Sequence, residues 1–131
     1  MGIHRKVELK NSHVVKIARN RISRYCNQLE CELSGSSIFL APVISHSEDF
    51  SEISMVRVSI PGIGTRMRHA RFLRRELRGT RISDIRWYNV GEWSGRPVLY
   101  DYGGSLVIIR IIARKIRSEF ATRHTHEAGS E

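Results

Sequence analysis

The stretch from Gly79 to Gly104, GTRISDIRWYNVGEWSGRPVLYDYGG, contains two short extended segments joined by a tight turn at Ser94-Gly95. Asp84 and Asn89 precede the first segment, and Asp101 follows the second. Because a hairpin brings its two ends together, two carboxylates and one amide are expected to meet at one edge of a sheet. Hard oxygen ligands beside a glycine turn are what a magnesium-bound phosphate requires. The stretch therefore predicts a site for a metal ion and a phosphate group.

These residues resemble the catalytic loop and the metal-binding loop of protein kinases and of aminoglycoside-phosphotransferase-like kinases. In that family four residues separate an aspartate from an asparagine, and an Asp-Phe-Gly motif follows after a short hairpin. Asp84 and Asn89 have the first spacing here, and Asp101-Tyr102-Gly103 follows the hairpin. The resemblance implies that Asp84 is catalytic and orients or deprotonates an acceptor hydroxyl. It also implies that Asn89 and Asp101 hold Mg²⁺ on the phosphates of ATP.

Upstream of this stretch, residues 6–10 and 13–18 are predicted to form two strands. The second strand contains Lys16 within an otherwise apolar run. A lysine in a buried strand requires an anionic partner; alternatively, Lys16 lies at a sheet edge and extends its ammonium group into water. The run resembles the Val-Ala-Ile-Lys strand of the same family, which implies that Lys16 is a catalytic residue that binds the phosphates of the nucleotide.

A helix is predicted over residues 21–33, which carry apolar side chains at helical spacing and are followed by a Ser-Gly-Ser sequence. These apolar side chains are Ile22, Tyr25, Cys26, Leu29 and Leu33. Glu30 lies one turn after Cys26 and could turn inward toward Lys16. The resemblance implies that Glu30 is the catalytic-site glutamate that pairs with the strand lysine. Glu32 is the competing choice, which helical phase does not exclude, and the remaining alternative is that Glu30 is a surface carboxylate.

A further strand is predicted to begin within residues 38–44, and a returning strand is predicted over residues 53–58. The resemblance implies that these are later strands of a kinase small lobe. Met55 would then lie at the back of the nucleotide pocket, and the backbone groups of Arg57 and Val58 would face the adenine ring.

Residues 59–64 contain the Pro and Gly residues of a linker. A helix is predicted over residues 66–78, with Thr65 as its N-terminal cap. Its expected inner stripe consists of Met67, Ala70, Leu73, Arg74 and Leu77. Residues 106–120 are predicted to be helical, although their β-branched side chains also allow a strand at the start, and residues 121–131 are predicted to be a flexible tail.

The composition is that of one soluble globular domain: 131 residues, 40% hydrophobic and 27% charged. No apolar run approaches the roughly 20 residues of a membrane span, so no membrane association is expected. Cys26 and Cys31 are five residues apart in one predicted helix and point in different directions, so we expect reduced thiols and a cytoplasmic protein.

The formal net charge is +9, and arginine contributes most of the positive charge. The densest run consists of Arg66, Arg68, Arg71, Arg74, Arg75, Arg78 and Arg81. The basic helix region 66–81 is either a surface for nucleic acid or an acidic protein partner, or a solvated helix face.

The expected fold class is α+β, with a kinase-like core: a small antiparallel sheet, a helix packed on it, a hinge, a second helix, a catalytic-loop hairpin and a C-terminal helix. The expected organisation is a small-lobe-like part at 1–58, a hinge at 59–64, a reduced large-lobe-like part at 65–120 and the tail, within one compact domain. The chain departs from the family pattern because residues 1–15 contain no Gly-x-Gly-x-x-Gly loop and because Ile82-Ser83 replaces the His-Arg before the catalytic aspartate.

The first hypothesis for function is a minimal kinase-like protein that binds ATP and Mg²⁺ and transfers phosphate to a hydroxyl of a protein or a small molecule. The second is a catalytically inactive kinase-like protein, or a basic binding module, that engages nucleic acid or an acidic protein. A third is a basic α+β nucleic-acid-binding domain in which the kinase resemblance is accidental.

Overall fold

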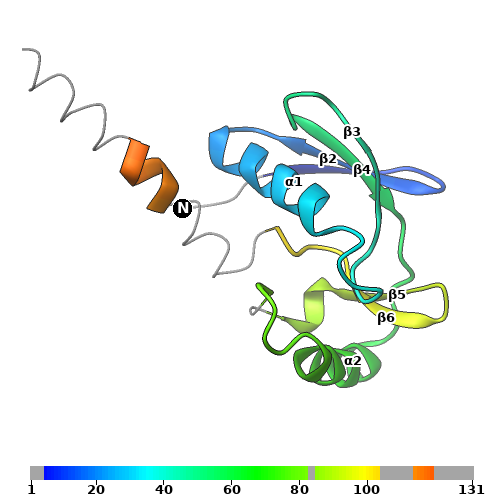
Figure 1. The fold of residues 1–131 in the computed structure, drawn as a ribbon. Helices are drawn as coiled ribbons and strands as arrows, with labels where there is room; N and C mark the ends of the chain where they lie inside the picture. Colours follow the sequence, from blue (N-terminus) through cyan, green and yellow to red (C-terminus); the bar gives the residue numbers. More distant parts are fainter. Residues whose placement is uncertain (1–4, 83–84, 104–113, 120–131) are drawn as a thin grey trace, which may run out of the picture.

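The computed structural model describes residues 5–82, 85–103 and 114–119. They form a mixed α+β fold with a small antiparallel sheet (Figure 1). The elements are β1 (Arg5–Leu9), β2 (His13–Ala18), α1 (Arg21–Leu33), β3 (Val43–His46), β4 (Glu52–Val56), α2 (Ile63–Glu76), the short 3-10 helix η1 (Trp87–Asn89), β5 (Val90–Trp93) and β6 (Arg96–Leu99). The expected α+β class with a small antiparallel sheet is therefore confirmed.

The first four strands form one antiparallel sheet in the order β1-β2-β4-β3. β2 is an inner strand, and Lys16 pairs with Val7 on one side and with Ile53 on the other. The side chain of Lys16 is 5% exposed. The alternative of an edge lysine that extends into water is therefore wrong, and this buried ammonium group requires an anionic partner.

α1 begins and ends at the predicted residues, and a capping box between Asn20 and Ser23 satisfies its first backbone groups. Its most deeply buried residues, however, are polar or small: Ser23, Cys26, Asn27 and Glu30. Among the predicted apolar stripe, Tyr25, Leu29 and Leu33 pack against Cys26, as does Ile116 of the helical segment 114–119, while Ile22 is exposed. α1 therefore turns a polar face toward the interior of the fold.

The segment between α1 and β3 does not form the strand expected from residue 38. Its backbone pairs instead with the end of β6: the Leu99 N–H donates to the Phe39 carbonyl and the Ala41 N–H donates to the Leu99 carbonyl, both at 2.8 Å. The strand β3 starts only at Val43; Pro42 has no N–H to donate and contributes only its carbonyl, which accepts from the Val56 N–H at 3.1 Å. β3 is therefore shorter than the expected strand, because Phe39 and Ala41 form their backbone hydrogen bonds with Leu99 of β6.

α2 begins at Ile63, after Gly62, and no side chain caps its N-terminus. The expected cap at Thr65 is wrong: this residue lies inside the helix, and its hydroxyl accepts a hydrogen bond from Arg68. Ala70, Leu73 and Leu77 are buried as expected. Met67 is 55% exposed, and Arg74 is exposed as well, because only a narrow strip of α2 contacts the hairpin.

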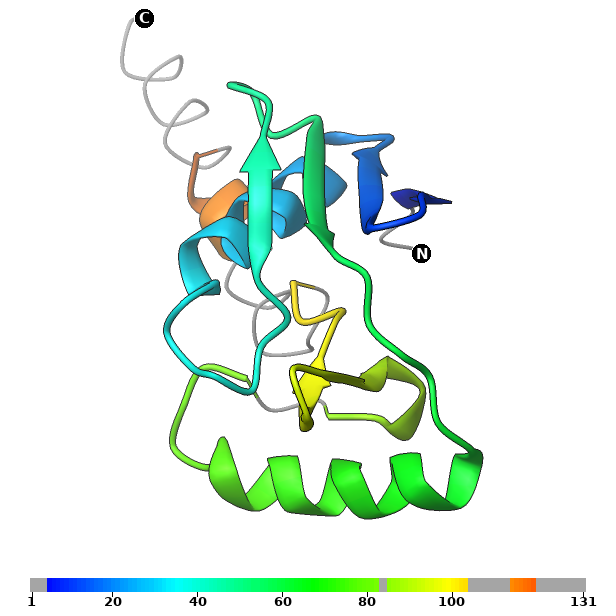
Figure 2. The ribbon, with the colours of Figure 1, turned by 90° about the vertical axis from the view of Figure 1, so that its right-hand side faces the viewer.

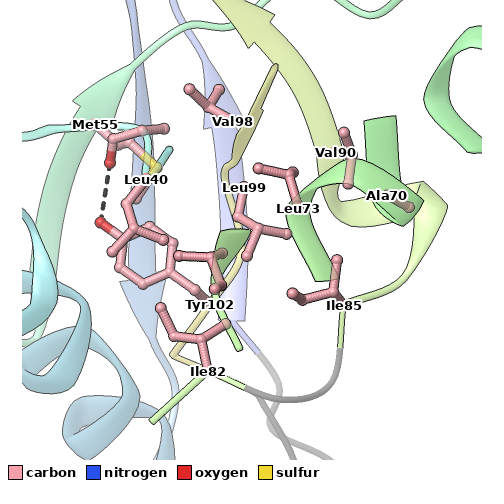
Figure 3. Packing of buried hydrophobic residues seen from close by; sticks show 12 residues of the cluster. Leu40, Met55, Ala70, Leu73, Ile82, Ile85, Val90, Val98, Leu99 and Tyr102 are labelled. Carbon is pink, nitrogen blue, oxygen red and sulfur yellow. Dashed lines mark hydrogen bonds between the residues drawn. The ribbon is translucent and has the colours of Figure 1, made fainter. Parts of the chain in front are cut away.

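The hairpin β5–β6 has the predicted turn at Ser94-Gly95, and both residues have positive φ angles, 54° and 75°. Figure 2 shows the hairpin lying between α2 and the four-stranded sheet. Its buried residues join those of α2, β4 and the segment before β3 in one hydrophobic cluster, with Tyr102 among Leu40, Ile82 and Leu99 (Figure 3). Within the described part of the chain, no helix is long and apolar enough to cross a lipid bilayer.

Candidate functional site

A cavity of about 860 Å³ lies between the four-stranded sheet and the end of the hairpin. Residues of β1, β2 and β4, of the segment after β4, of η1 and of the segment after β6 line it. Six residues assigned to nucleotide or metal binding from the sequence are among them: Lys16, Met55, Arg57, Val58, Asn89 and Asp101. The volume is within the usual range for a small-molecule or cofactor site. Asp84, the predicted catalytic base, lies outside the described residues.

Lys16 forms a buried ion pair with Glu30, and their Nζ and Oε1 atoms are 2.7 Å apart. The ammonium group also donates to the Tyr100 carbonyl. Glu32 is exposed and accepts a hydrogen bond from Gln28 on the same helix, so it is not the partner of Lys16. The structure thus favours Glu30 over the alternative that the sequence left open.

Glu30 is fully buried, yet it is held as a carboxylate. Its Oε2 atom accepts from Arg5 at 2.9 Å, from the Tyr102 N–H at 3.2 Å and from the Gly103 N–H at 2.7 Å, while Oε1 accepts from Lys16. Burial raises the pKa of Glu30, but the charges of Arg5 and Lys16 outweigh burial and bring the pKa down to about 2. Burial and the charge of Arg5 lower the pKa of Lys16, and Glu30 opposes this change.

Gly103 makes this arrangement possible because its backbone lies against α1. A Cβ atom at this position would be 2.4 Å from the Cys26 carbonyl oxygen and 2.8 Å from the carboxylate of Glu30. No side chain fits there without moving the helix or the loop. The close packing against α1 therefore explains why a glycine occupies position 103, independently of any family resemblance.

Asn89 and Asp101 lie at the two ends of the hairpin and line the same cavity, as the hairpin geometry predicted. A backbone hydrogen bond of 3.1 Å from the Tyr100 N–H to the Asn89 carbonyl holds the two ends together. Within the described residues, no group of three or more His, Cys, Asp or Glu side chains could hold a metal ion. One carboxylate and one amide suit Mg²⁺ when substrate phosphates and water supply the remaining ligands.

Arg5 is a residue of the site that the sequence did not indicate. Its Nη2 atom is 2.6 Å from Oδ1 of Asp101, and its side chain is 6% exposed. The partners of Arg5 lie 22, 25 and 96 residues away in the sequence, so neither spacing nor periodicity pointed to them. The only local signal was a cation at the start of a strand, which is common on protein surfaces.

Met55, Arg57 and Val58 line another part of the cavity. Met55 is 1% exposed and lies on β4. The backbone groups of Arg57 and Val58 make no backbone hydrogen bond within the described residues, whereas the next residue, Ser59, is paired in both directions with Glu92 at 2.9 Å. The two residues expected to face the adenine ring are therefore free at the backbone, and the chain is fixed immediately after them.

The arginine run of α2 separates into two groups. Arg66 and Arg74 form hydrogen bonds within the fold. Arg66 donates to the carbonyls of Val90 and Tyr88, and Arg74 donates to that of Ile85. The residues Arg68, Arg71 and Arg75 of α2 are exposed and recur at intervals of three or four, which places them in one row opposite the buried face, and the exposed Arg78 follows in the turn after the helix. Within the described residues, no carboxylate forms an ion pair with this row.

Comparison of the chain with protein-family models, with the sequences of curated proteins and with solved structures gives no match in any of the three. The interpretation of the cavity therefore depends on its own residues and geometry.

Proposed function

We propose that this cavity binds ATP together with Mg²⁺ and that the chain is a minimal kinase-like protein of the cytoplasm. The observation that carries the proposal is the convergence of Lys16, Asn89, Asp101 and the segment from Met55 to Val58 on one cavity. These positions come from four separate parts of the sequence, and the resemblance to the kinase family assigns each of them, on sequence alone, to ATP or its metal. The ion pair of Lys16 with Glu30 adds a fifth element of the same set.

In this proposal each part of the cavity has a separate task. The adenine ring lies against Met55 and forms hydrogen bonds with the backbone of Arg57 and Val58. The Lys16 ammonium group, fixed by Glu30, binds phosphate oxygens, while Asn89 and Asp101 supply oxygen ligands on the metal side. When bound, Mg²⁺ neutralises phosphate charge and aligns the terminal phosphate.

We further propose that the bound nucleotide donates its terminal phosphoryl group to a hydroxyl of a protein or a small molecule. The hydroxyl oxygen bonds to the terminal phosphorus atom, the bond from that phosphorus to ADP breaks, and the hydroxyl proton passes to the carboxylate of Asp84. Phosphoryl transfer of this kind needs positioning and charge neutralisation more than covalent catalysis by the protein.

Calorimetric titration with ATP, with and without Mg²⁺, tests the binding step. Asp101→Asn removes the only carboxylate that we assign to the metal, so we expect it to abolish magnesium-dependent binding. Glu48→Gln is the matched control, because Glu48 is exposed and does not line the cavity. The absence of binding at millimolar ATP, or equal binding by Asp101→Asn, would contradict the proposal.

A second candidate function follows from the arginine row of α2, which suits the evenly spaced phosphates of a nucleic acid. Under this alternative the chain is a basic binding module, with or without turnover of nucleotide. Replacement of Arg71 and Arg75 by Gln should weaken binding of an RNA or DNA oligonucleotide and reduce the slope of log affinity against log salt by roughly two. Replacement of the exposed Arg19 and Arg24 by Gln is the control with the same change of charge. An equal effect of both pairs would show that net charge, and not the row on α2, governs binding.

A further inference from the structure

Arg5 places a second cation inside the candidate site, next to Lys16. The residue opens β1, and its guanidinium group reaches α1 and the segment after β6. It donates to Oδ1 of Asn27 at 3.1 Å, to Oε2 of Glu30 at 2.9 Å and to Oδ1 of Asp101 at 2.6 Å, and it lines the cavity. Lys16 and Arg5 thus use the two oxygen atoms of the same buried carboxylate.

The two carboxylates hold Arg5 in different ways. Glu30 is fully buried and accepts from four donors, so its position is fixed. The side chain of Asp101 is 42% exposed, and Arg5 is its ion-pair partner. Asn27 is fixed from its other end, since its Nδ2 atom donates to the Phe50 carbonyl at 2.8 Å. Asp101 can therefore turn away from Arg5 while Glu30 and Asn27 keep the guanidinium in place.

The charges of the cluster change when Asp101 turns away. The charges of Arg5, Lys16, Glu30 and Asp101 sum to zero, so before a ligand binds this cluster has no excess positive charge to attract phosphate. Once Asp101 faces a metal ion, Arg5 and Lys16 share the single carboxylate of Glu30, which leaves one excess positive charge. The N–H of Arg5 that donates to Asp101 also becomes available to another acceptor. A guanidinium group is well suited to bind phosphate oxygens.

We infer that Arg5 is a phosphate-binding residue of this cavity, which exchanges Asp101 for the oxygens of a polyphosphate when Asp101 binds the metal ion. This inference rests on the proposed function for the magnesium-bound nucleotide, but the chemistry of recognition is that of any polyphosphate chain. It assigns to Arg5 a role that no motif in the sequence indicates.

The first experiment compares wild type with Arg5→Gln in calorimetric titrations with ATP, inorganic tripolyphosphate and adenosine, each with Mg²⁺. Loss of one charge-assisted hydrogen bond should weaken ATP and tripolyphosphate roughly tenfold or more and leave adenosine unchanged. Lys6→Gln is the matched control, since Lys6 is the next residue of β1, has a 56% exposed side chain and pairs only with Glu8 among the described residues. Lys6→Gln should change each affinity by less than about twofold.

The second experiment uses the opposite change, in buffer without Mg²⁺. Asp101→Asn releases Arg5, so tripolyphosphate should bind several-fold more tightly to this variant than to wild type. Removal of any nearby negative charge would also favour an anion, and the double variant of Arg5→Gln with Asp101→Asn separates the two causes. The inference predicts that the double variant loses the gain; a gain that survives in the double variant overturns the inference.

The outcomes for the two proposals are distinct. Unchanged binding of ATP and tripolyphosphate by Arg5→Gln overturns the role of Arg5 and leaves the nucleotide site standing. Tripolyphosphate binding that depends on Arg5, without ATP binding, overturns the nucleotide proposal and supports Arg5. Absence of binding for both ligands overturns both. If Arg5→Gln does not fold, Arg5→Lys takes its place, because it retains the charge without the planar fork. Its affinity for tripolyphosphate should lie between those expected for wild type and for Arg5→Gln. The inference is overturned if Arg5→Lys and the metal-free Asp101→Asn protein both bind tripolyphosphate with wild-type affinity.

Discussion

Glu30 joins three parts of the chain through one carboxylate: β1 through Arg5, β2 through Lys16, and the segment after β6 through the Tyr102 and Gly103 amides. Burial of charged groups costs free energy, and apolar residues of the same size often give equal or greater stability. A buried cluster of Arg5, Lys16 and Glu30 is therefore a poor source of stability, which agrees with the ligand-binding role that we propose for the adjoining cavity. Once the cluster is present, however, the fold depends on each of its members.

The acid sensitivity of the fold provides a test at the scale of this residue. The pKa of Glu30 falls from 4.5 to about 2 on folding, so its contribution to the free energy of unfolding is complete above about 4.5 and is lost as the pH falls toward 2. Glu30→Gln should lower stability at neutral pH by on the order of 3 kcal/mol, since it leaves two buried cations with one partner fewer. The deficit should shrink across this acid window. Urea unfolding at a series of pH values measures both effects.

Glu32→Gln is the matched control for this prediction, because Glu32 is exposed on the same helix two residues later. It should change stability by less than about 0.5 kcal/mol at every pH. A constant deficit for Glu30→Gln from neutral to acid pH would show that Glu30 is not the group whose protonation weakens the fold.

At this scale the sequence indicated part of the site. Lys16 was conspicuous because a cation interrupts an apolar strand, and the hairpin brought Asn89 and Asp101 together. The choice between Glu30 and Glu32 needed the rotation of α1 against the sheet, which helical periodicity alone does not give. Arg5 was missed because its role depends on Asp101, which lies 96 residues away.

The hairpin β5–β6 is the element with the clearest local origin. Ser94 and Gly95 both have positive φ angles, as a two-residue turn that matches the twist of its strands requires. Glycine adopts this conformation without strain, whereas serine does so at some cost, and asparagine adopts it more readily than serine. The turn thus has the backbone conformation that a two-residue hairpin prefers, but serine at its first position adopts a positive φ angle at some cost in free energy.

We expect Ser94→Asn to stabilise the protein by several tenths of a kcal/mol, up to about 1 kcal/mol, because Asn-Gly is the preferred pair for this turn. Ser94 is exposed, so the change affects the backbone conformation and not the packing. Gly95→Ala, with open space around the added methyl group, should destabilise through the φ angle alone. Thermal unfolding of the three proteins measures the order; a lower melting temperature for Ser94→Asn would contradict this account of the turn.

The contrast among elements shows which signals a sequence carries. The limits of α1 and the hairpin turn follow from neighbouring residues, and both were predicted correctly. The segment before β3 was assigned to a strand because its residues are apolar. Those residues instead pair with β6, and Phe39 packs edge-on against Phe72 of α2, with ring centroids 5.4 Å apart. The predicted Thr65 cap is wrong for a different reason: α2 begins after Gly62 without a capping side chain, and such a start leaves little trace in the sequence.

At the scale of the whole molecule, one hydrophobic cluster connects the part expected to resemble a small lobe with the part expected to resemble a large lobe. Leu40, Ala41 and Met55 come from the first part, and the buried residues of α2 and of the hairpin come from the second (Figure 3). The cavity lies between these same two parts, and Ser59 is paired with Glu92 where the chain crosses from one to the other. The sequence predicted the elements of both parts, but their joint packing involves contacts far apart in the chain.

This shared core leads to a prediction about cooperativity. Leu40 is 2% exposed, and Leu40→Ala should cost roughly 2–5 kcal/mol by leaving a cavity at the centre of the cluster. Both tryptophans, Trp87 and Trp93, lie on the hairpin side, so their fluorescence reports on that part, whereas hydrogen exchange at the amides of β2 and β4 reports on the sheet. If the described residues unfold as one unit, Leu40→Ala should shift the fluorescence transition and lower the protection of the sheet amides by the same free energy.

Ile38→Ala is the control: this residue lies two positions earlier and is 61% exposed, so its replacement should leave both quantities nearly unchanged. A shift of the fluorescence transition with unchanged protection of the sheet would instead show that the two parts unfold separately, and the cavity between them would then open without global unfolding.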